Sequence, residues 1–385
     1  MKVLILGIDG YLGWPTALRM INNGHQVFGI DDFSKRSQLR KNKVTSTFGE
    51  SSITKRLKKL SKHQKNLPKI FRASITDREK LNTIIRKTKP DVIFNFAHIP
   101  SAPYSMANAE NCLRTWRNNT EGQLNLLWAI KEFSPKSHLI KLGTMGEYGT
   151  PNVPITEGSF LYKSKDGKHK DYLPFPKQPG SFYHLTKVAN THNMAFACRI
   201  WNIRATDIMQ GVIYGTRTPD IESFESKTYF YFDEMFGTVI NRMLASVIID
   251  HPLPVYGKGK MTRGILSLTD AIDCYELIMN NPANLGECRV INQFDEAKSV
   301  FEMANEIINE SKNNGYYPKI KYYKDPRIEK ENHLYKPESK WLRAHGYKRN
   351  HMFSESVKFM LQDLKVKKST ILKFKHAIKP KTTWK

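Results

Sequence analysis

Residues 2–32 read KVLILGIDGYLGWPTALRMINNGHQVFGIDD, and this stretch decides the fold. Lys2–Leu6 is a short apolar run that is typical of a buried strand, and a G-x-x-G-x-x-G turn follows it. The pattern then predicts a helix from about Trp14 to Asn23 and a second strand over His25–Ile30. Strand, turn, helix and strand within about 30 residues are typical of a βαβ unit.

The same alternation continues along most of the chain. Apolar β-type runs predict further strands at Lys69–Arg72, Val92–Phe96, His138–Leu142, Ile203–Met209 and Arg289–Ile291, with helical patterns between most of them. This rhythm predicts an α/β fold of the Rossmann type, in which helices cover both faces of a doubly wound parallel sheet. From residue 216 onward Pro and Gly interrupt the pattern. We therefore expect a cofactor-binding domain over residues 1–215. Residues 216–385 are expected to form mainly a smaller substrate-binding lobe, although some of their segments return to the first domain and the chain ends in a basic tail.

Charge is the unusual feature of the composition. The 385 residues include 61 Lys and Arg against 36 Asp and Glu, for a formal net charge of +25, while the 40% hydrophobic content is that of an ordinary globular protein. Twelve basic residues and one acid lie between Lys35 and Lys69, and eight lysines and no acid lie between Lys365 and Lys385. These two stretches hold 19 of the 25 charges, and we interpret them as a solvated face and a solvated tail.

Several kinds of segment and motif are missing from the sequence, and this narrows the possible classes of function. The chain begins with Met-Lys and passes at once into a strand, so we expect no signal or transit peptide. No apolar run approaches the roughly 18 to 20 residues that a membrane span needs. The four cysteines form no C-x-x-C pair and no cluster with zinc spacing. We therefore expect a cytoplasmic protein with reduced thiols, no metal site and no stable membrane insertion.

The glycine turn predicts a phosphate site. Gly7, Gly10 and Gly13 let the backbone turn tightly and approach a pyrophosphate closely. The helix behind the turn offers free N–H groups and the positive end of its dipole. Because the turn stands between a strand and a helix, and a second strand follows, we predict a dinucleotide cofactor here.

The end of the second strand predicts which dinucleotide binds. Asp31 and Asp32 stand there, and a carboxylate at this place can bind both hydroxyls of an adenosine ribose and repel a 2′-phosphate. We therefore predict NAD as the cofactor. Lys35 and Arg36 favour the alternative, NADP, because they could hold a phosphate.

A second constellation predicts acid–base chemistry. Tyr183 and Lys187 form a Y-x-x-x-K spacing in a segment that reads as helix, so both side chains share one helix face. A nearby ammonium favours the phenolate and lowers the tyrosine pKa from about 10 toward neutrality. Thr144 follows the strand over His138–Leu142, where its hydroxyl would face the same crevice. Such a tyrosine can take the proton of a sugar hydroxyl that loses a hydride.

Phosphate turn, threonine and Y-x-x-x-K occur in the order found in extended short-chain dehydrogenase/reductases, and the chain resembles that family. Within it, the chain resembles the UDP-sulfoquinovose synthases. The segments that carry the resemblance run from Gly7 to Tyr335, with an echo in the C-terminal TTWK: GIDGYLGWPTAL, SAPYSM, HLIKLGTMGEYGTPN, LPFPKQPGSFYHLTKV, IRATDIMQGVIYG, HPLPVYGKGKMTRG, INQF and DPRIEKENHLY.

The resemblance implies an activity and a catalytic triad of Thr144, Tyr183 and Lys187. The implied reaction converts UDP-glucose and sulfite to UDP-sulfoquinovose. NAD-mediated oxidation at C4 comes first, water is lost across C5 and C6, sulfite adds at C6, and C4 is reduced again. Related enzymes are usually homodimers through a helix pair, so the resemblance also implies a homodimer.

One segment separates this chain from sugar-nucleotide 4,6-dehydratases. Those enzymes carry T-D-E-x-Y-G, in which Asp is the acid and Glu the base, whereas residues 144–149 here read TMGEYG. The elimination must therefore use other groups. One hypothesis is that His184 takes the C5 proton and that Glu147 is structural. The alternative is that His184 only packs or positions the substrate, and the sequence does not decide between the two.

The resemblance also implies a set of contacts. Cofactor contacts are expected from Gly7, Gly10, Tyr11, Leu12, Gly13, Asp31, Asp32, Phe33, Ser34, Arg36, Ser74, Ile75, Phe96, Ala97, Asn118, Asn119, Tyr183 and Lys187. Substrate contacts are expected from Tyr104, Thr144, Tyr183, Gln210, Ile213, Thr238, Asn241, Val255, Tyr256, Gly257, Arg263 and Arg327.

Two positions depart from the family pattern. Pro100 stands where plant-type members have an Arg, so His98 or a lysine would serve the sulfite side, and Ser74 stands where an adenine-binding Asp is expected.

Two other functions stay open at this point. An NAD-dependent UDP-hexose 4-epimerase or 4,6-dehydratase shares nearly all of the scaffold, although the GTMGEYG and SAPYSM segments favour the synthase. A basic RNA- or membrane-surface-binding protein on an inactive dehydrogenase scaffold would explain the charge. The intact triad argues against nucleic acid as a partner. So does the scarcity of aromatics through Lys35–Lys69, where Phe33 and Phe48 near its start are the exceptions, because few rings are left to stack on bases.

Overall fold

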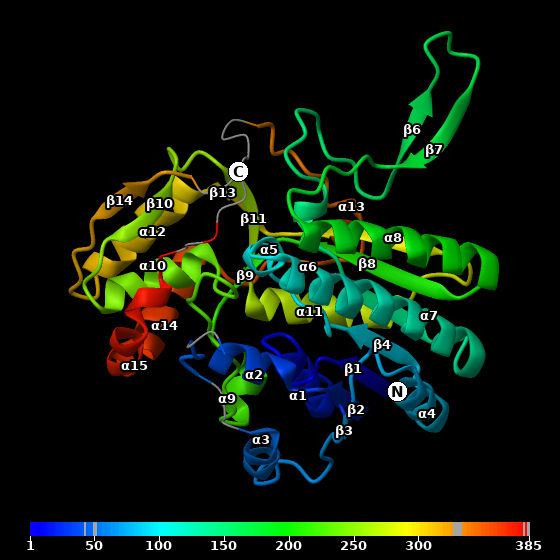
Figure 1. Ribbon diagram of the computed structural model, residues 1–385, viewed down its shortest axis with the longest axis horizontal. Coiled ribbons are helices and arrows are strands. Elements are labelled where there is room, and N and C mark those ends of the chain that lie inside the picture. Colours follow the sequence, from blue (N-terminus) through cyan, green and yellow to red (C-terminus); the bar gives the residue numbers. More distant parts are fainter. Residues whose placement is uncertain (42–43, 49–51, 326–332, 380–381, 383–385) are drawn as a thin grey trace.

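The computed structural model describes residues 1–41, 44–48, 52–325, 333–379 and 382 (Figure 1). Its centre is a parallel sheet that has seven strands among these residues, in the order β12-β8-β5-β4-β1-β2-β3. The strands are β1 (Lys2–Leu6), β2 (Gln26–Asp31), β3 (Lys69–Arg72), β4 (Val92–Asn95), β5 (His138–Leu142), β8 (Arg204–Gln210) and β12 (Cys288–Gln293). Each strand expected from the sequence lies in this sheet, which confirms the predicted fold class.

The strand order creates the crevice in which ligands of such folds bind. The chain runs outward from β1 through β2 to β3, and then returns to place β4 on the other side of β1. Connections from β1 and β4 therefore leave in opposite directions, so a cleft opens beyond the carboxyl ends of these two strands.

The residues of β1 alternate between two helix layers. Val3 and Ile5 pack with Trp14 on one face of the sheet, and Leu4 and Leu6 pack on the other face. The first layer contains α1 (Gly13–Asn22), α9 (Pro219–Ser223), α11 (Leu268–Asn280) and α13 (Lys340–Ala344). The second layer contains α4 (Arg78–Thr88), α7 (Gly122–Phe133) and α8 (Phe182–Trp201). Burial on both faces explains why the strands are nearly continuous apolar runs.

A second core lies beside the main sheet. It gathers α10 (Val239–Ile248), α12 (Val300–Lys312), α14 (Phe353–Lys365) and α15 (Lys368–Lys373) around β10 (Leu253–Tyr256), which pairs with β14 (Ile320–Tyr323). A small sheet ordered β13 (Glu296–Ser299), β11 (Thr262–Ser267) and β9 (Val212–Tyr214) adjoins this core. Phe48 and Tyr214 from the first part of the chain pack into the second core. The boundary at residue 215 stays a prediction.

The remaining elements surround these two cores. They are α2 (Ser34–Lys41), α3 (Ile53–Leu60), α5 (Ala102–Met106), α6 (Ala109–Trp116), a π-helical turn (Arg117–Glu121), and 3-10 turns at Met145–Glu147 and Lys375–Ala377. The hairpin of β6 (Ser159–Lys163) and β7 (Lys170–Pro174) projects away from the body (Figure 1). Among the described residues, no helix combines the length and apolar character that crossing a bilayer requires.

Candidate active site

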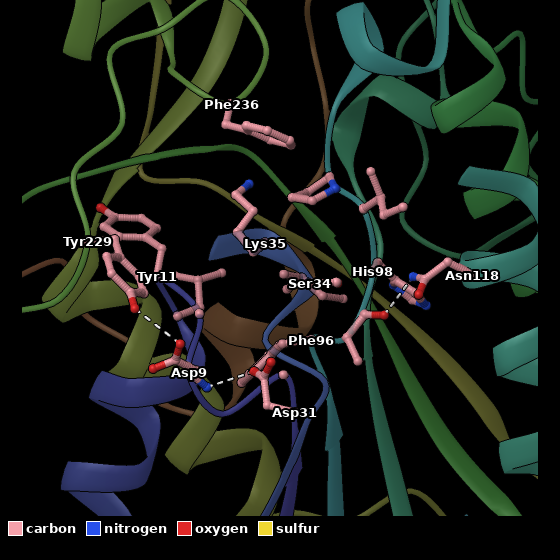
Figure 2. A pocket seen from close by; sticks show the side chains of 18 of the residues that line it. Asp9, Tyr11, Asp31, Ser34, Lys35, Phe96, His98, Asn118, Tyr229 and Phe236 are labelled. Atoms are coloured by element: carbon pink, nitrogen blue, oxygen red, sulfur yellow. Dashed lines mark hydrogen bonds between the residues drawn. The ribbon is translucent and has the colours of Figure 1, made fainter. Parts of the chain in front are cut away.

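A cavity of about 320 Å³ opens beyond the carboxyl ends of the central strands (Figure 2). The predicted site residues that line it are Gly7, Gly10, Tyr11, Leu12, Gly13, Asp31, Asp32, Ser34, Arg36, Ser74, Ile75, Phe96, Ala97, Asn118, Thr144, Tyr183, Lys187, Gln210, Ile213 and Thr238. The predicted residues that lie elsewhere are Phe33, Tyr104, Asn119, His184, Asn241, Val255, Tyr256, Gly257 and Arg263. Arg327 lies outside the described residues.

The glycine turn forms the floor of one end of the cavity. Gly7 has a φ of +79°, and a Cβ built at Gly13 would lie 2.1 Å from the carbonyl oxygen of Gly7. The turn and the first residue of α1 can therefore pack this closely only with glycine. Leu12 precedes α1 and provides no side-chain cap. The N–H of Trp14 donates to Gly10 O (3.3 Å) and Pro15 has no N–H, so the backbone N–H groups of Leu12 and Gly13 are the candidates for binding a pyrophosphate at this end of the cavity.

Two aspartates close the adjoining edge of the cavity. Asp31 Oδ2 accepts a hydrogen bond from the backbone N–H of Asp9 (2.9 Å), and Oδ1 accepts one from Phe33 (2.7 Å). Asp32 accepts one from the N–H of Ser34 (2.8 Å). Burial, with the nearby charge of Asp9, raises the pKa of Asp31 to about 7. The Asp31 carboxyl therefore stands where a ribose hydroxyl would donate to it, and its charge varies near neutral pH.

Asp9 organises the basic residues next to the turn. Arg36 donates to both of its carboxylate oxygens (2.7 and 2.8 Å), Arg56 donates to Oδ1 (2.9 Å), and the Tyr229 hydroxyl donates to Oδ2 (3.1 Å). Arg56 is fully buried. The interpretation of the Lys35–Lys69 stretch as a solvated face is therefore wrong at these two arginines, because a buried carboxylate binds them.

The threonine of the proposed triad starts a short capped turn. Thr144 Oγ1 accepts a hydrogen bond from Gly146 N, and Glu147 Oε1 accepts one from Thr144 N (3.2 Å). The other oxygen of Glu147 accepts from Lys177 Nζ (2.7 Å). Glu147 thus fixes the backbone that carries Thr144, because both carboxylate oxygens are occupied inside the protein.

A buried charge network extends this support. Lys141 is fully buried and pairs with Asp207 (3.0 Å), and its Nζ lies 3.9 Å from Glu147 Oε1. Thr191 donates to Asp207 Oδ2 (2.6 Å), and Lys141 donates to the backbone carbonyl of Lys187 (3.3 Å). The network therefore connects the backbone on both sides of the reaction centre.

Tyr183 and Lys187 share the cavity, but their electrostatics differ from the prediction. The Lys187 ammonium lies 5.7 Å from the centroid of the Tyr183 ring. Its Nζ contacts Leu142 O and lies 2.6 Å from His98 Nδ1. Burial, with the charge of Glu147, raises the pKa of Tyr183, so the predicted lowering is wrong for this arrangement. Burial, with the charge of Lys141, lowers the pKa of Lys187 to about 7.

His184 lies outside the cavity lining, on the first turn of α8. Ser181, the residue that caps this helix, places its Oγ 3.0 Å from His184 Nδ1. A Cβ built at Gly146 would lie only 2.5 Å from His184 Nε2. The imidazole therefore fills the space that any larger residue at position 146 would need.

The asparagines occupy the π-helical turn between α6 and α7. Asn118 lines the cavity and donates to Ala97 O (3.0 Å, Figure 2). Asn119 is buried, accepts from the N–H of Ile99 (2.8 Å) and donates to Thr186 Oγ1 (3.1 Å). A π-turn often marks a functional site, and this one ties the loop after β4 to α8.

The predicted substrate residues divide into two groups. Gln210 lines the cavity and donates to Gln293 Oε1 (2.6 Å). Thr238 also lines it and caps α10, where it accepts from the N–H of Asn241 (3.2 Å). Val255 is fully buried in the second core, so its side chain does not reach the cavity.

Several lining residues were not predicted from the sequence. Tyr229, Tyr231 and Phe236 reach the cavity from the segment before α10, and the Lys35 ammonium lies 3.1 Å from the Phe236 ring centroid (Figure 2). Burial lowers the pKa of Lys35 to about 7. The aromatic run at residues 229–232 was the only sequence signal, and it has no periodicity that would place it at the cavity.

Comparison with known proteins places this site in a family. The NAD dependent epimerase/dehydratase family model matches residues 3–292. The chain is 40% identical over 385 residues to a UDP-sulfoquinovose synthase of Sulfolobus acidocaldarius, covering 100% of this chain and 98% of that protein. It is 39% identical to the chloroplastic UDP-sulfoquinovose synthase of Spinacia oleracea, covering 100% of this chain and 79% of that protein.

The chain belongs to the UDP-sulfoquinovose synthase family. It is an NAD-dependent enzyme within the wider epimerase/dehydratase family. The fold is shared with the UDP-glucose 4-epimerase of Bifidobacterium longum in complex with NAD⁺ and UDP, at TM-score 0.70 and 16% identity, covering 94% of this chain and 98% of that one. UDP-glucuronic acid 4-epimerase of Bacillus cereus, in complex with UDP-glucuronic acid and NAD, matches at TM-score 0.69 and 20% identity, covering 94% and 100%.

The two departures from the UDP-sulfoquinovose synthase pattern both fall at the cavity. Pro100 and His98 both line it, and His98 contacts Lys187. Ser74 lines the cofactor end, where its hydroxyl lies 2.8 Å from that of Thr76. The glycine cradle, the uncapped helix and Asp31 together fit NAD, so neither departure removes the cofactor site.

Proposed function

We propose that this chain converts UDP-glucose and sulfite to UDP-sulfoquinovose. The observation that carries the proposal is the pairing of Gly146 with His184. In 4,6-dehydratases a glutamate base stands at the position of Gly146, whereas here the imidazole of His184 occupies that space. His184, although outside the cavity lining, is the candidate base that α8 offers in place of that glutamate. The identity to UDP-sulfoquinovose synthases over the full chain supports the same activity.

The first step is oxidation at C4. Tyr183 takes the proton of the C4 hydroxyl, and the Thr144 hydroxyl binds the C4 oxygen. Gly7, Gly10, Gly13 and Asp31 would hold NAD⁺, which would supply the hydride acceptor for C4 and the hydride donor for its later reduction. The raised pKa of Tyr183 makes its phenol hold the proton firmly, so positive charge on Lys187 is needed to favour the phenolate during transfer.

The second step removes water and adds sulfite. The 4-keto group acidifies C5–H; His184 takes that proton and passes it to the C6 hydroxyl, which leaves as water. The sulfur of sulfite then forms a bond to C6 of the resulting enone, and a proton returns to C5. Glu147 takes no part in these transfers, because both of its oxygens accept hydrogen bonds within the protein.

The UDP end of the substrate would lie toward the second core. Gln210, Ile213 and Thr238 line the cavity wall on that side. Arg263 lies on β11, outside the cavity lining. It stays proposed for the pyrophosphate because a guanidinium can donate two parallel hydrogen bonds. Arg327, which lies outside the described residues, stays proposed for the same role. Tyr256 and Gly257 stay proposed for the surroundings of uracil and ribose, and Asn241 and Tyr104 stay proposed as substrate contacts, whereas the buried side chain of Val255 does not reach the substrate.

We also propose a homodimer through the outer surface of α6, α7 and α8. These helices pack against one another and expose large apolar side chains, each between 38 and 56% accessible: Leu113, Trp116, Leu124, Trp128, Phe182, Leu185, Phe196 and Ile200. A patch of this kind is rare on a monomer, and a second copy would cover it. The cytoplasm remains the proposed location, although the plant relative is named chloroplastic.

The function is tested by product mass. Purified protein with UDP-glucose and sulfite is expected to yield a sulfonated sugar nucleotide, and omission of sulfite is expected to abolish it. Formation of UDP-galactose would indicate an epimerase. A 4-keto-6-deoxy product formed without sulfite would indicate a dehydratase, and either outcome would overturn the proposal.

A further inference from the structure

His98 lies in direct contact with the proposed catalytic lysine. It follows β4, is 9% exposed, and places its Nδ1 2.6 Å from Lys187 Nζ. On the other side of the ring, Nε2 lies 3.4 Å from the side-chain nitrogen of Asn95, which donates to Gln123 Oε1 (2.8 Å). The imidazole thus lies between a buried amide pair and the Lys187 ammonium. Because a neutral imidazole has one acceptor nitrogen, the shorter contact assigns the acceptor to Nδ1, and Nε2 then carries the proton and makes no hydrogen bond with the Asn95 amide nitrogen.

The partners of Lys187 set this lysine apart from its buried neighbours. Lys141 pairs with Asp207, and Lys177 pairs with Glu147. Among the described residues, Lys187 makes no ion pair, and its Nζ contacts only the carbonyl of Leu142 and the imidazole of His98. An ammonium has three N–H donors, so one remains for a ligand in the cavity.

We propose that His98 is the positioning residue of Lys187: its neutral imidazole accepts a hydrogen bond at Nδ1 and holds the ammonium in its charged form beside Tyr183. The inference rests on the proposed function only through the role of Lys187. Nothing in the family resemblance gives His98 this task.

The charges around His98 keep its ring neutral. Lys187 faces it from α8 and Lys141 from β5, and both positive charges, together with burial as the larger cause, lower the pKa of His98 well below its usual range. The charges of Glu147 and Asp207 have the opposite effect on Lys187: they raise its pKa and so favour its charged form. A neutral ring can accept at Nδ1, whereas a protonated one would repel the ammonium.

Removal of the acceptor has a directional consequence. A hydrogen bond to the charged form of a group favours that form, so its loss lowers the pKa of Lys187 further. Lysine is charged below its pKa, and activity that needs the charged form is lost as the pH rises through that pKa. A variant without an acceptor at position 98 should therefore lose activity at a lower pH than the parent enzyme.

The experiment compares His98→Leu with His98→Asn in the full chain. Leucine fills the space without an acceptor, whereas asparagine places an amide oxygen near the position of Nδ1. We expect His98→Leu to reduce kcat roughly 10- to 100-fold and to shift the alkaline limb of the pH profile downward, and His98→Asn to restore most of both. His138→Leu is the matched control, because His138 is also buried, lies 2.9 Å from Thr206 Oγ1 and does not line the cavity.

A second measurement does not depend on turnover. The pKa of Lys187 can be followed by NMR of ¹³C-labelled lysine, with the signal assigned through Lys187→Met. We expect this pKa to fall in His98→Leu and to recover in His98→Asn, even if the product assay shows another reaction. An unmoved Lys187 pKa and an unmoved alkaline limb in a folded His98→Leu protein would overturn the inference. Should that variant not fold, His98→Asn and His98→Gln decide it, because glutamine reaches past the Nδ1 position and should lower the lysine pKa.

Discussion

The two ends of the cavity handle buried charge in opposite ways. At the cofactor end a single carboxylate, Asp9, binds two guanidinium groups, Arg36 and Arg56. At the catalytic end two carboxylates, Glu147 and Asp207, lie among three buried lysines. The cofactor end is thus assembled from arginine and the catalytic end from lysine.

The difference follows from the chemistry of the two cations. Arginine stays charged and offers a rigid fork, so it suits a turn whose geometry must not change. Lysine is a point charge whose pKa shifts readily with burial, so it suits a site that moves protons. Lys187, whose pKa burial lowers to about 7, is the clearest example. The comparison predicts that substitutions at the cofactor end mainly change NAD binding, and that substitutions at the catalytic end mainly change kcat.

Tyr183→Phe should have the largest effect. It removes the proposed proton acceptor at the catalytic end, so kcat is expected to fall by roughly 10²- to 10⁴-fold while NAD affinity stays close to that of the parent. Tyr162→Phe on the exposed hairpin is the control and should leave kcat unchanged. The rate of sulfonated product formation measures the effect, and a Tyr183→Phe enzyme at the parent rate would remove the tyrosine from the mechanism.

Lys177→Met and Arg56→Met should destabilise the protein comparably but impair different functions. Each leaves a buried carboxylate with one partner fewer, so the free energy of unfolding should fall by about 3–5 kcal/mol. Lys177→Met should also lower kcat, because its partner Glu147 fixes the threonine turn, and Arg56→Met should weaken NAD binding, because its partner Asp9 belongs to the glycine turn. Denaturant unfolding and NAD titration measure these effects. Lys168→Met, on the exposed hairpin, is the control. If Lys177→Met and Arg56→Met lost kcat and NAD affinity to the same extent, the two ends would not have separate roles.

Gly146→Ala should act within the catalytic end alone. The added methyl group would lie 2.5 Å from His184 Nε2 and must displace the imidazole. We expect formation of sulfonated product to fall roughly 10- to 100-fold while oxidation of C4, followed as absorbance of reduced nicotinamide, persists. His184→Ala should behave alike. If C4 oxidation and formation of sulfonated product fell equally, the substitution would instead have disrupted the whole turn at residues 144–149.

Discrimination between NAD and NADP should vary with pH at the cofactor end. Because the pKa of Asp31 is raised to about 7, its carboxyl is mostly neutral at pH 6 and mostly charged at pH 8. A charged carboxylate repels a 2′-phosphate, so the preference for NAD should grow up to about tenfold over this interval. Asp31→Asn, which has no titrating group, should show a constant and weaker preference. A flat ratio in the parent enzyme would assign the preference to another residue.

The sequence predicted local features better than contacts between residues that are far apart in the chain. The seven strands, the glycine turn and the placement of Thr144, Tyr183 and Lys187 at one cavity follow from short-range periodicity and the order of strands. The Asp9 cluster was not predicted, because Tyr229 reaches it from 220 residues further along the chain. Such long-range contacts depend on loops that have no periodic signal.

Electrostatics was the other limit of sequence reasoning. The Y-x-x-x-K spacing placed Lys187 correctly near Tyr183, yet spacing cannot register burial, which raises the tyrosine pKa. Arg56 lies in the stretch that was interpreted as a solvated face, and it is 0% exposed in the structure. Whether a cation is solvated or paired depends on the tertiary fold around it.

The division of labour between Tyr183 and His184 is tested most directly by one comparison in heavy water. The parent enzyme with UDP-glucose and sulfite in D₂O should give sulfonated product with one deuterium at C5, because a proton returns there after sulfite adds. His184→Ala should still oxidise C4, visible as reduced nicotinamide, and should form no sulfonated product. A His184→Ala enzyme that makes sulfonated product at the parent rate would contradict the assignment of the C5 base.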